Sequence, residues 1–475
     1  MKKLKRQTKV IATIGPATES EQNLERLITN GVDVCRINMA HADHEWVREI
    51  SSKIRTVGKR LNREPAIMMD VKGPEIRTGY LQNEIKLKKD DLLDLIFEAQ
   101  PVPPILDDIW QVEVNYDKLA DHIKSGDTVL LDNGLIQLLV LKSSPKQIRC
   151  KILQDAILKG RRHVNLPGIE TGLPSLTEKD RRDSIVGIEC EHDYFALSFT
   201  RDADSIDLFR SFLRENGSDA QIIAKLEDQK GVSNIDEIIS ASDAIMIARG
   251  DLGIECPFED LPIIQRRTVG ACLASGKPVI VATHLLESMI ESPVPTRAEV
   301  SDVANAVNEG ADSLMLSGET TTGKYPFKSL NMLNRIASKI ESEIIPGLSE
   351  ELRLFRPKAK MLLSAAMLAM KMKDSAVLVF TRSGDLAAKL GALRPNGAPL
   401  FAFTDIDGLH RRLRLIWGIE PFLMSFSENP ELTIKNAIEK LKKEQWVEAG
   451  DQLVTVTNVF AGGKVVESIQ LREVE

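Results

Sequence analysis

The sequence predicts an α/β protein whose main part is a closed (β/α)8 barrel (TIM barrel), with a small β-barrel domain inserted into it and an α/β domain after it. Three observations carry this prediction. Eight short apolar runs alternate with helical patterns, one long stretch of β-like runs interrupts them, and further strands and helices follow. Alternating βα units favour a parallel sheet covered by helices, and eight units close into a barrel. A doubly wound open sheet is the alternative.

The barrel strands are expected where apolar runs are bounded by turn residues. Between them, helical periodicity predicts helices at Ser20–Thr29 and His44–Arg60, and Thr177 with its acidic first turn starts another. The eight expected strands are Lys9–Ile14, Val32–Asn38, Ala66–Val71, Tyr194–Phe199, Ile222–Glu227, Ala244–Ile247, Pro278–Thr283 and Ser313–Leu316.

The remaining patterns divide the chain. Short β-like runs such as Thr128–Leu131 and Ile136–Leu141 predict the inserted domain. Strands at Ala376–Thr381 and Leu400–Thr404, with a helix at Asp385–Leu393, predict the last one. We expect domain boundaries at 1–76 (barrel), 77–172 (inserted domain), 173–347 (barrel) and 348–475 (C-terminal domain).

Composition narrows the class of protein. A chain of 475 residues is too long for one ordinary core. The formal charge of −7 argues against a general binder of nucleic acid or membrane surfaces, and no apolar run is long enough to span a membrane. Five scattered cysteines without a C-x-x-C pair fit reduced thiols. We therefore expect a cytoplasmic protein that binds neither nucleic acid nor membrane.

Polar side chains gather where the predicted strands end. In a βα barrel the active site lies at the carboxyl ends of the strands. Lys225 and Glu227 share one face of their strand because side chains alternate. The full set at these ends is Arg36, Asn38, Asp70, Lys72, Thr200, Arg201, Lys225, Glu227, Asp251, Thr283, His284, Ser317 and Glu319.

These residue types suit phosphoryl transfer. Arg36 and Lys225 can bind phosphate oxygens. Glu227 and Asp251 are oxygen ligands of the kind that Mg²⁺ or Mn²⁺ prefers, and a metal would neutralise charge during transfer. The backbone amides of Gly250 and Asp251 lead into a helical turn and could bind a carboxylate. The residues alone predict an enzyme acting on a phosphorylated small acid.

Several motifs are spread along nearly the whole chain. They are Thr8–Ala17, Lys72–Gly79, Leu131–Gly134, Val164–Gly168, Lys225–Glu227, Ala248–Gly253, Pro295–Asn305 and Leu316–Thr320. Through these motifs the sequence resembles the pyruvate kinase family. The resemblance implies a barrel domain, a lid formed by the inserted domain, and a C-terminal regulatory domain in a homotetramer. It implies transfer of the phosphoryl group of phosphoenolpyruvate to ADP in glycolysis.

The resemblance also implies roles for single residues. Arg36 and Lys225 would bind the phosphate, with Lys225 stabilising the phosphoryl group in transfer, and Glu227 and Asp251 would bind Mg²⁺. Thr283 would assist protonation of the enolate. The remaining implied residues are Ser317 and Glu319 in the proton network, Gly250 at the substrate, Asn38, His41 and Arg77 at the nucleotide, and Asn38, Asp70 and Val71 at a K⁺ ion.

The chain departs from the family pattern at several positions. Ala40 replaces a serine whose hydroxyl binds K⁺, while Glu75 is the residue of K⁺-dependent members, so we expect K⁺ stimulation with weakened K⁺ affinity. His284 replaces a glutamine, which is either a packing change or a titratable group beside the proton network. Asp385 opens the helix expected at an effector site, and Asn458–Lys464 lacks an arginine. These features predict no strong activation by fructose 1,6-bisphosphate.

Two other functions remain open at this stage. One is another Mg²⁺-dependent barrel enzyme acting on phosphoenolpyruvate or pyruvate, a lyase or mutase, which would not need the lid or a nucleotide contact at Arg77. The other is a catalytically impaired relative kept for binding or regulation. Ala40 and His284 favour that reading, whereas the retained charged residues oppose it.

Overall fold

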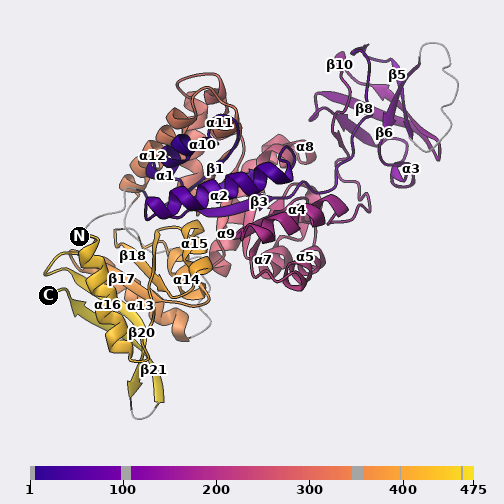
Figure 1. The fold of residues 1–475 in the computed structure, drawn as a ribbon. Helices are drawn as coiled ribbons and strands as arrows, with labels where there is room; N and C mark the ends of the chain where they lie inside the picture. Colours follow the sequence, from indigo (N-terminus) through magenta and orange to yellow (C-terminus); the bar gives the residue numbers. More distant parts are fainter. Residues whose placement is uncertain (1–5, 98–108, 345–356, 396, 462–463) are drawn as a thin grey trace.

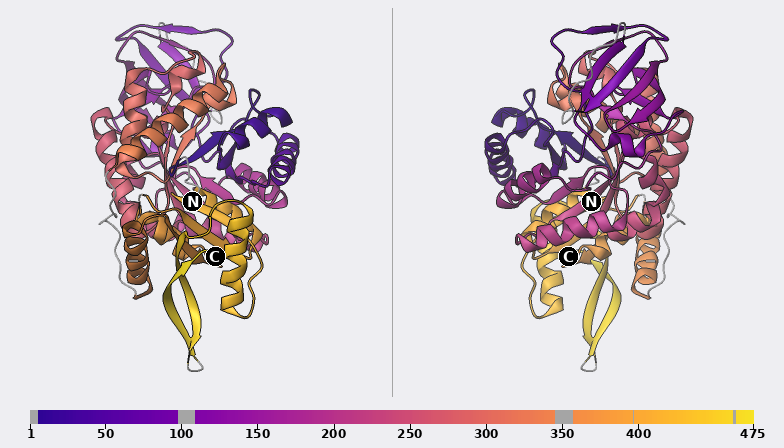
Figure 2. Two further views of the ribbon diagram at one scale, coloured as in Figure 1. Left: turned by 90° about the vertical axis from the view of Figure 1, so that its left-hand side faces the viewer. Right: turned by 90° about the vertical axis from the view of Figure 1, so that its right-hand side faces the viewer.

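The computed structural model describes residues 6–97, 109–344, 357–395, 397–461 and 464–475. It consists of a central barrel, a lid and a C-terminal unit (Figure 1). The lid and the C-terminal unit lie at opposite ends of the barrel (Figure 2). The expected boundary between 347 and 348 falls outside the described residues, as do the side chains of the expected effector loop at 458–464.

The central unit is a closed barrel of eight parallel strands, as the sequence predicts. Each strand pairs with its neighbours in the order β1-β16-β15-β14-β13-β12-β3-β2. Most predicted ends are correct within two residues. The strands are β1 Lys9–Thr13, β2 Val34–Asn38, β3 Ala66–Asp70, β12 Tyr194–Leu197, β13 Gln221–Leu226, β14 Ala244–Ala248, β15 Val279–Ala282 and β16 Ser313–Leu316.

Side chains that alternate along each strand contribute to two separate cores, one inside the barrel and one between the barrel and its helices. On β13, Ile223 packs inside the barrel with Met246 and Met315, whereas Ile222 and Ala224 pack outward against the helices. Both faces of a parallel barrel strand are buried, which explains its continuous apolar sequence. Residues 225 and 227 have the parity of Ile223, so their side chains turn towards the barrel axis where the strand ends.

Helices surround the barrel. Thr177 begins α4 through a capping box with Asp180, whose side chain bonds back to the Thr177 amide. The helices are α1 Glu21–Thr29, α2 His44–Arg60, α4 Glu178–Glu189, α5 Ala203–Glu215, α6 Gln229–Ser233, α7 Ile235–Ala241, α8 Arg249–Glu255, α9 Leu261–Ser275, α10 Arg297–Glu309, α11 Gly318–Thr321 and α12 Pro326–Glu343, with 3₁₀ turns η1 Phe258–Asp260 and η2 Glu287–Ile290.

The lid is a curled half-barrel. Its strands form one six-stranded sheet, β11-β7-β8-β9-β5-β6, and a two-stranded sheet, β10-β4. The elements are β4 Ile85–Leu87, β5 Leu92–Phe97, β6 Ile109–Val114, α3 Leu119–His122, β7 Thr128–Leu131, β8 Ile136–Ser144, β9 Gln147–Ile152, β10 Ala156–Leu158 and β11 Val164–Asn165.

The C-terminal unit is a mixed sheet, β19-β18-β17-β20-β21, flanked by helices. The sequence did not predict β19, which contains Pro421; a proline is tolerated there because β19 is an edge strand. The elements are α13 Pro357–Lys371, β17 Ser375–Phe380, α14 Asp385–Ala392, β18 Leu400–Thr404, α15 Asp407–Arg412, η3 Leu413–Leu415, β19 Ile419–Leu423, α16 Pro430–Lys443, β20 Gln452–Ala461 and β21 Lys464–Glu473.

This unit covers the amino ends of the barrel strands. Leu415 is buried in the barrel's inner core, and its carbonyl accepts a 3.0 Å hydrogen bond from Ser313 at the start of β16. The Lys9 ammonium at the start of β1 donates to the Ile419 carbonyl at 2.6 Å. The opposite, carboxyl ends of the strands face the lid side. Among the described residues, no helix is long and apolar enough to cross a membrane.

Candidate active site

The end of β13 places a cation between two carboxylates. The Lys225 Nζ lies 2.8 Å from Glu227 Oε1 and 3.0 Å from Asp70 Oδ1. It also donates to the Ser198 hydroxyl at 2.7 Å. All three charged side chains are almost fully buried. The pair spaced two residues apart therefore shares a face, as alternation predicts.

A second cation reaches the same carboxylate from β2. The Arg36 guanidinium donates from Nε to Asp70 Oδ2 at 2.8 Å and from one terminal nitrogen to the Thr13 hydroxyl at 3.0 Å. Asp70 thus joins both cations from β3, although it is far from Lys225 in sequence. This contact depends on the order of strands in the sheet, where β3 pairs with β2 and only β12 separates it from β13.

One cavity of about 290 Å³ opens onto these groups. It is lined by most of the predicted site residues, by residues of the lid, and by residues of the segment that leads from β3 into the lid. Its lining comprises Arg36, Asn38, Ala40, Asp70, Val71, Lys72, Glu75, Arg77, Asp132, Asn133, Arg161, Arg162, His163, Ser198, Phe199, Lys225, Glu227 and Asp251.

Burial and charge set the protonation of the site. Burial would raise the pKa of Asp70, but Lys225 and Arg36 hold it below its ordinary value. Burial raises the pKa of Glu227 to about 7; Lys225 opposes the shift and the nearby charge of Asp251 adds to it. The cations of the protein alone therefore do not fully neutralise the carboxylates of Glu227 and Asp251.

That donor set fits a divalent cation. Two carboxylates leave room for substrate oxygens and water, which is how Mg²⁺ is usually held. The described residues contain no group of three or more histidine, cysteine or acidic side chains suited to a metal, so the protein would supply only part of the shell. A bound cation would stabilise the charged form of Glu227 and remove its repulsion with Asp251.

The exit of β15 is strained. Thr283 and His284 have φ values of +65° and +57°, in the left-handed region that β-branched residues rarely adopt. The Thr283 hydroxyl accepts the Gly250 amide at 2.7 Å, and its carbonyl accepts the Arg249 guanidinium, also at 2.7 Å. The Gly250 amide, expected to bind a carboxylate, thus has a side-chain partner here.

The exit of β16 forms a small network next to it. The Glu319 carboxylate is buried and accepts the backbone amides of Ser317 at 2.8 Å and Leu286 at 3.1 Å. Burial raises the pKa of Glu319. The Ser317 hydroxyl is buried and has no hydrogen-bond partner among the described residues. Thr283, Ser317 and Glu319 do not line the cavity around Lys225.

Some expected site residues lie elsewhere. His41 is exposed and outside the cavity. Thr200 and Arg201, expected at the end of the fourth strand, lie just beyond β12, which ends at Leu197 instead of Phe199. Thr200 bonds back to the Leu197 carbonyl and Arg201 pairs with Asp228 at 2.7 Å.

The residues that sequence reasoning missed hold the others in place. Ser198 follows the true end of β12 and accepts from Lys225. Thr13 ends β1 and accepts from Arg36. Arg249 joins Thr283 to Asp302, with guanidinium–carboxylate distances of 2.7 and 2.8 Å. Ser198 and Thr13 could have been found from the sequence, since both are polar residues at the end of a buried strand.

Comparisons with known proteins agree along the whole chain. The family model of the pyruvate kinase barrel domain matches residues 5–330, and that of the pyruvate kinase alpha/beta domain matches residues 359–466. The chain is 38% identical to a pyruvate kinase of Sporosarcina psychrophila over 465 residues, covering 96% of this chain and 78% of that protein.

Two further relatives extend the agreement. Plastidial pyruvate kinase 2 of Arabidopsis thaliana is 36% identical over 480 residues, covering 99% of this chain and 82% of that protein. The crystal structure of a pyruvate kinase from Cryptosporidium parvum superposes with a TM-score of 0.91 at 32% identity, covering 99% and 97% of the two chains.

The fold and the site define a (β/α)8 barrel enzyme in which Arg36 and Lys225 lie beside the carboxylates of Asp70 and Glu227, a charge pattern that suits phosphoryl transfer. The full-length matches make the assignment specific. The chain belongs to the pyruvate kinase family. Its activity is that of a pyruvate kinase, with phosphoenolpyruvate and ADP as the implied substrates in glycolysis.

Proposed function

We propose that phosphoryl transfer from phosphoenolpyruvate to ADP takes place in the cavity around Lys225. The observation that carries this proposal is the position of the Lys225 ammonium, buried between Asp70 and Glu227. Two carboxylates keep it charged: burial would lower its pKa, but they raise it above the ordinary value. A fixed, charged donor of this kind stabilises a phosphoryl group in flight without reorganising.

Arg36 would bind the phosphate oxygens before and after transfer. Its guanidinium is held in place by Asp70 and Thr13. A planar fork fixed on one side presents its remaining donors in a defined direction, which positions the group for attack by the nucleotide. Asp70 would thus act by orienting both cations.

Glu227 and Asp251 would hold Mg²⁺, or Mn²⁺ in its place. The bound ion supplies charge neutralisation for the phosphoryl group and its substrate oxygens. Glu227 is itself oriented by the Phe199 amide, which donates to its second oxygen at 2.6 Å. The Gly250 and Asp251 region of α8 would receive the substrate carboxylate after Gly250 exchanges its Thr283 partner.

Thr283, Ser317 and Glu319 would deliver the proton that converts the enolate to pyruvate. Support comes from the Ser317 hydroxyl, which has no hydrogen-bond partner in the part of the chain that the structure describes, and from the raised pKa of Glu319. A buried hydroxyl without a partner can hold a water, and a carboxyl with a raised pKa is better suited to proton transfer near neutral pH than an ordinary one.

The lid would bring Arg77 to the nucleotide, with Asn38 and His41 beside it, and would exclude water during transfer. The Arg77 Nε donates to Glu75 at 2.6 Å, and Lys72 pairs with the same carboxylate at 2.9 Å. Pairing with Glu75 leaves only part of the Arg77 fork for a phosphate, so closure must present its outer nitrogens.

We also propose a weakened K⁺ site at Asn38, Asp70 and the Val71 carbonyl. The absence of a hydroxyl at Ala40 supports this reading. So does the use of the oxygens by protein donors, since Asn38 Oδ1 accepts the Ala40 amide at 3.2 Å and the Val71 carbonyl accepts Ser198 at 2.7 Å.

The proposed assembly is a cytoplasmic homotetramer. The face of α9 and the turn before it expose apolar side chains, with Phe258 77% and Ile263 66% exposed. A second copy would cover this face, and light scattering of the purified chain measures the assembly directly. The cysteines described are all unpaired, which fits a reducing compartment.

The test of the proposed site is a coupled assay for pyruvate and ATP formed from phosphoenolpyruvate and ADP, run with and without Mg²⁺. We expect product only with the metal in the parent protein, and none above background in Glu227→Gln. Full activity of Glu227→Gln at ordinary Mg²⁺ concentrations would reject the metal assignment.

A further inference from the structure

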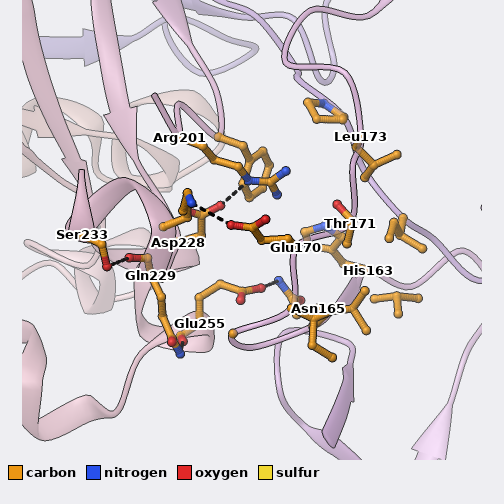
Figure 3. Close-up of a pocket in the computed structure, with 18 residues that line it drawn as sticks. His163, Asn165, Glu170, Thr171, Leu173, Arg201, Asp228, Gln229, Ser233 and Glu255 are labelled. Carbon is orange, nitrogen blue, oxygen red and sulfur yellow. Dashed lines mark hydrogen bonds and ion pairs between the residues drawn. The ribbon is translucent and has the colours of Figure 1, made fainter. Parts of the chain in front are cut away.

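A second cavity of about 240 Å³ lies where the lid joins the barrel. Figure 3 shows Asn165, Glu255, Gln229, Asp228 and Arg201 around it. The pyruvate kinase reaction as described above assigns no role to these side chains.

The lid reaches α8 through one buried hydrogen bond beside this cavity. Asn165 Nδ2 donates to Glu255 Oε1 at 3.0 Å, and both residues are at least nine-tenths buried. Asn165 belongs to β11, the last lid strand, which pairs with β7. The Glu255 carboxylate therefore accepts a donor from the lid's return to the barrel.

The helix that this hydrogen bond holds also carries Asp251, the proposed metal ligand. Helix α8 runs from Arg249 to Glu255 and includes Asp251. Its last carbonyl, at Glu255, accepts Gln229 Nε2 at 2.5 Å, which ties it to the segment after Glu227. Glu255 thus lies between the lid on one side and the exit of β13 on the other.

The turn between β7 and β8 approaches the same helix. A methyl group built at Gly134 in that turn would lie 3.9 Å from the Ile254 side chain. The lid therefore comes close to α8 at two adjacent residues, through the Asn165–Glu255 hydrogen bond and near Ile254.

We propose that Asn165 and Glu255 are positioning residues through which the lid sets the placement of α8, and with it the metal affinity of Asp251. Glu255 does not line the cavity around Lys225, where the metal and the substrate would bind. Partners that orient a metal ligand typically contribute about 10- to 100-fold in metal affinity when removed. This inference rests on the proposed metal site at Glu227 and Asp251.

The experiment titrates the purified full chain with Mn²⁺ alone, without phosphoenolpyruvate or ADP, and follows free Mn²⁺ by electron paramagnetic resonance. We expect Glu255→Ala to weaken Mn²⁺ binding by about 10-fold. Glu255→Gln keeps an acceptor for Asn165 and should bind within about twofold of the parent. Asn165→Ala should match Glu255→Ala, and the double variant should be no weaker than either single variant, since one contact is removed once.

The matched control is Lys230→Ala. Lys230 pairs with Glu170 at 2.7 Å across the same joint, but both side chains are largely exposed and neither belongs to α8. This variant should bind Mn²⁺ as the parent does. Melting temperatures of all variants report whether the fold is retained, and steady-state kinetics should show a raised Mg²⁺ requirement with kcat restored at saturating Mg²⁺.

The outcomes separate the two proposals. If Glu227→Gln still binds Mn²⁺ like the parent, the metal site itself is misplaced. If Glu227→Gln loses binding while Glu255→Ala retains it, the metal site stands and the positioning role is wrong. Equal losses in Glu255→Gln and Glu255→Ala would also overturn the role, because the hydrogen bond would then not be the cause.

Discussion

Lys225, near the end of β13, and Glu227, just after it, form an ion pair of 2.8 Å. Side chains at this spacing point the same way, so the pair is stable only because both turn into a buried site that also contains Asp70. Removing one member leaves a buried charge without its partner, which is far costlier than losing an exposed pair. The arrangement holds the ammonium of Lys225 charged and fixed.

Replacing Lys225 by methionine should lower kcat on the order of 10³-fold, since one preorganised donor to a developing charge contributes that much. The coupled assay measures this directly. Lys230→Met serves as a control, because Lys230 is on the helix after the same strand and largely exposed. A Lys225→Met protein that keeps a tenth of the parental kcat would contradict the role.

The sequence alone anticipates the barrel well because its strands are buried on both faces. Ala244–Ile247 and Ser313–Leu316 read as short apolar runs, and the structure has them within one residue. The lid strands Leu92–Phe97 and Gln147–Ile152 were not predicted. Their outer faces are partly exposed, and strand pairing across the lid, which a local pattern does not contain, decides them.

The candidate site was likewise predicted only in part. Alternation places Lys225 beside Glu227, but nothing local indicates that Asp70 joins Lys225 to Arg36, since the order of strands in the barrel brings them together. The left-handed backbone at Thr283 was equally unforeseen. Tertiary contacts, such as the Arg249 guanidinium on its carbonyl, hold that conformation against its intrinsic cost.

The K⁺ site gives a gain-of-function prediction. The parent should be stimulated by K⁺ with a high half-saturating concentration. Ala40→Ser should lower that concentration about fivefold to tenfold, because one added oxygen ligand contributes roughly 1 kcal/mol or slightly more. Initial rates across a K⁺ series, at constant ionic strength with tetramethylammonium, measure both values. Full activity of the parent without K⁺ would show that no such site operates.

Fructose 1,6-bisphosphate should leave the phosphoenolpyruvate saturation curve unchanged. Asp385 begins α14, where an effector phosphate would otherwise meet free amides, and its carboxylate is already paired with Lys389 at 2.6 Å. Arg382 in the same loop is paired with Asp405 at 2.6 Å. A large leftward shift of the curve on adding the bisphosphate would refute this expectation.

Asp33 should be among the most sensitive positions for stability. Its buried carboxylate lies 2.8 Å from both Arg6 and Arg63 and accepts the Val10 amide at 2.9 Å. Asp33→Ala should lower the free energy of unfolding by about 3–5 kcal/mol, since two partly buried guanidinium groups lose their buried partner. Urea denaturation measures the change.

The control for Asp33 is an exposed pair of the same kind. Arg48 and Glu189 form a 2.7 Å ion pair with each side chain 51% exposed. Glu189→Ala should change the free energy of unfolding by at most about 1 kcal/mol. Similar losses in the two variants would mean that burial of Asp33 does not determine its contribution.

His192 should make the protein sensitive to mild acid. The imidazole is buried, with Nε2 2.8 Å from the Ser51 hydroxyl, and burial, with a smaller effect of Arg55, lowers its pKa from 6.5 to about 3. Between these values the unfolded chain binds a proton that the folded chain does not, so the free energy of unfolding falls as the pH drops below 6.5. At pH 5 this loss reaches about 2 kcal/mol relative to pH 8.

His192→Gln tests this pH dependence, because glutamine cannot gain that proton. Urea denaturation should show that the variant has a lower free energy of unfolding than the parent at pH 8, and that this difference becomes smaller by about 2 kcal/mol at pH 5. A deficit that stays constant across the two pH values would show that His192 is protonated equally in both states.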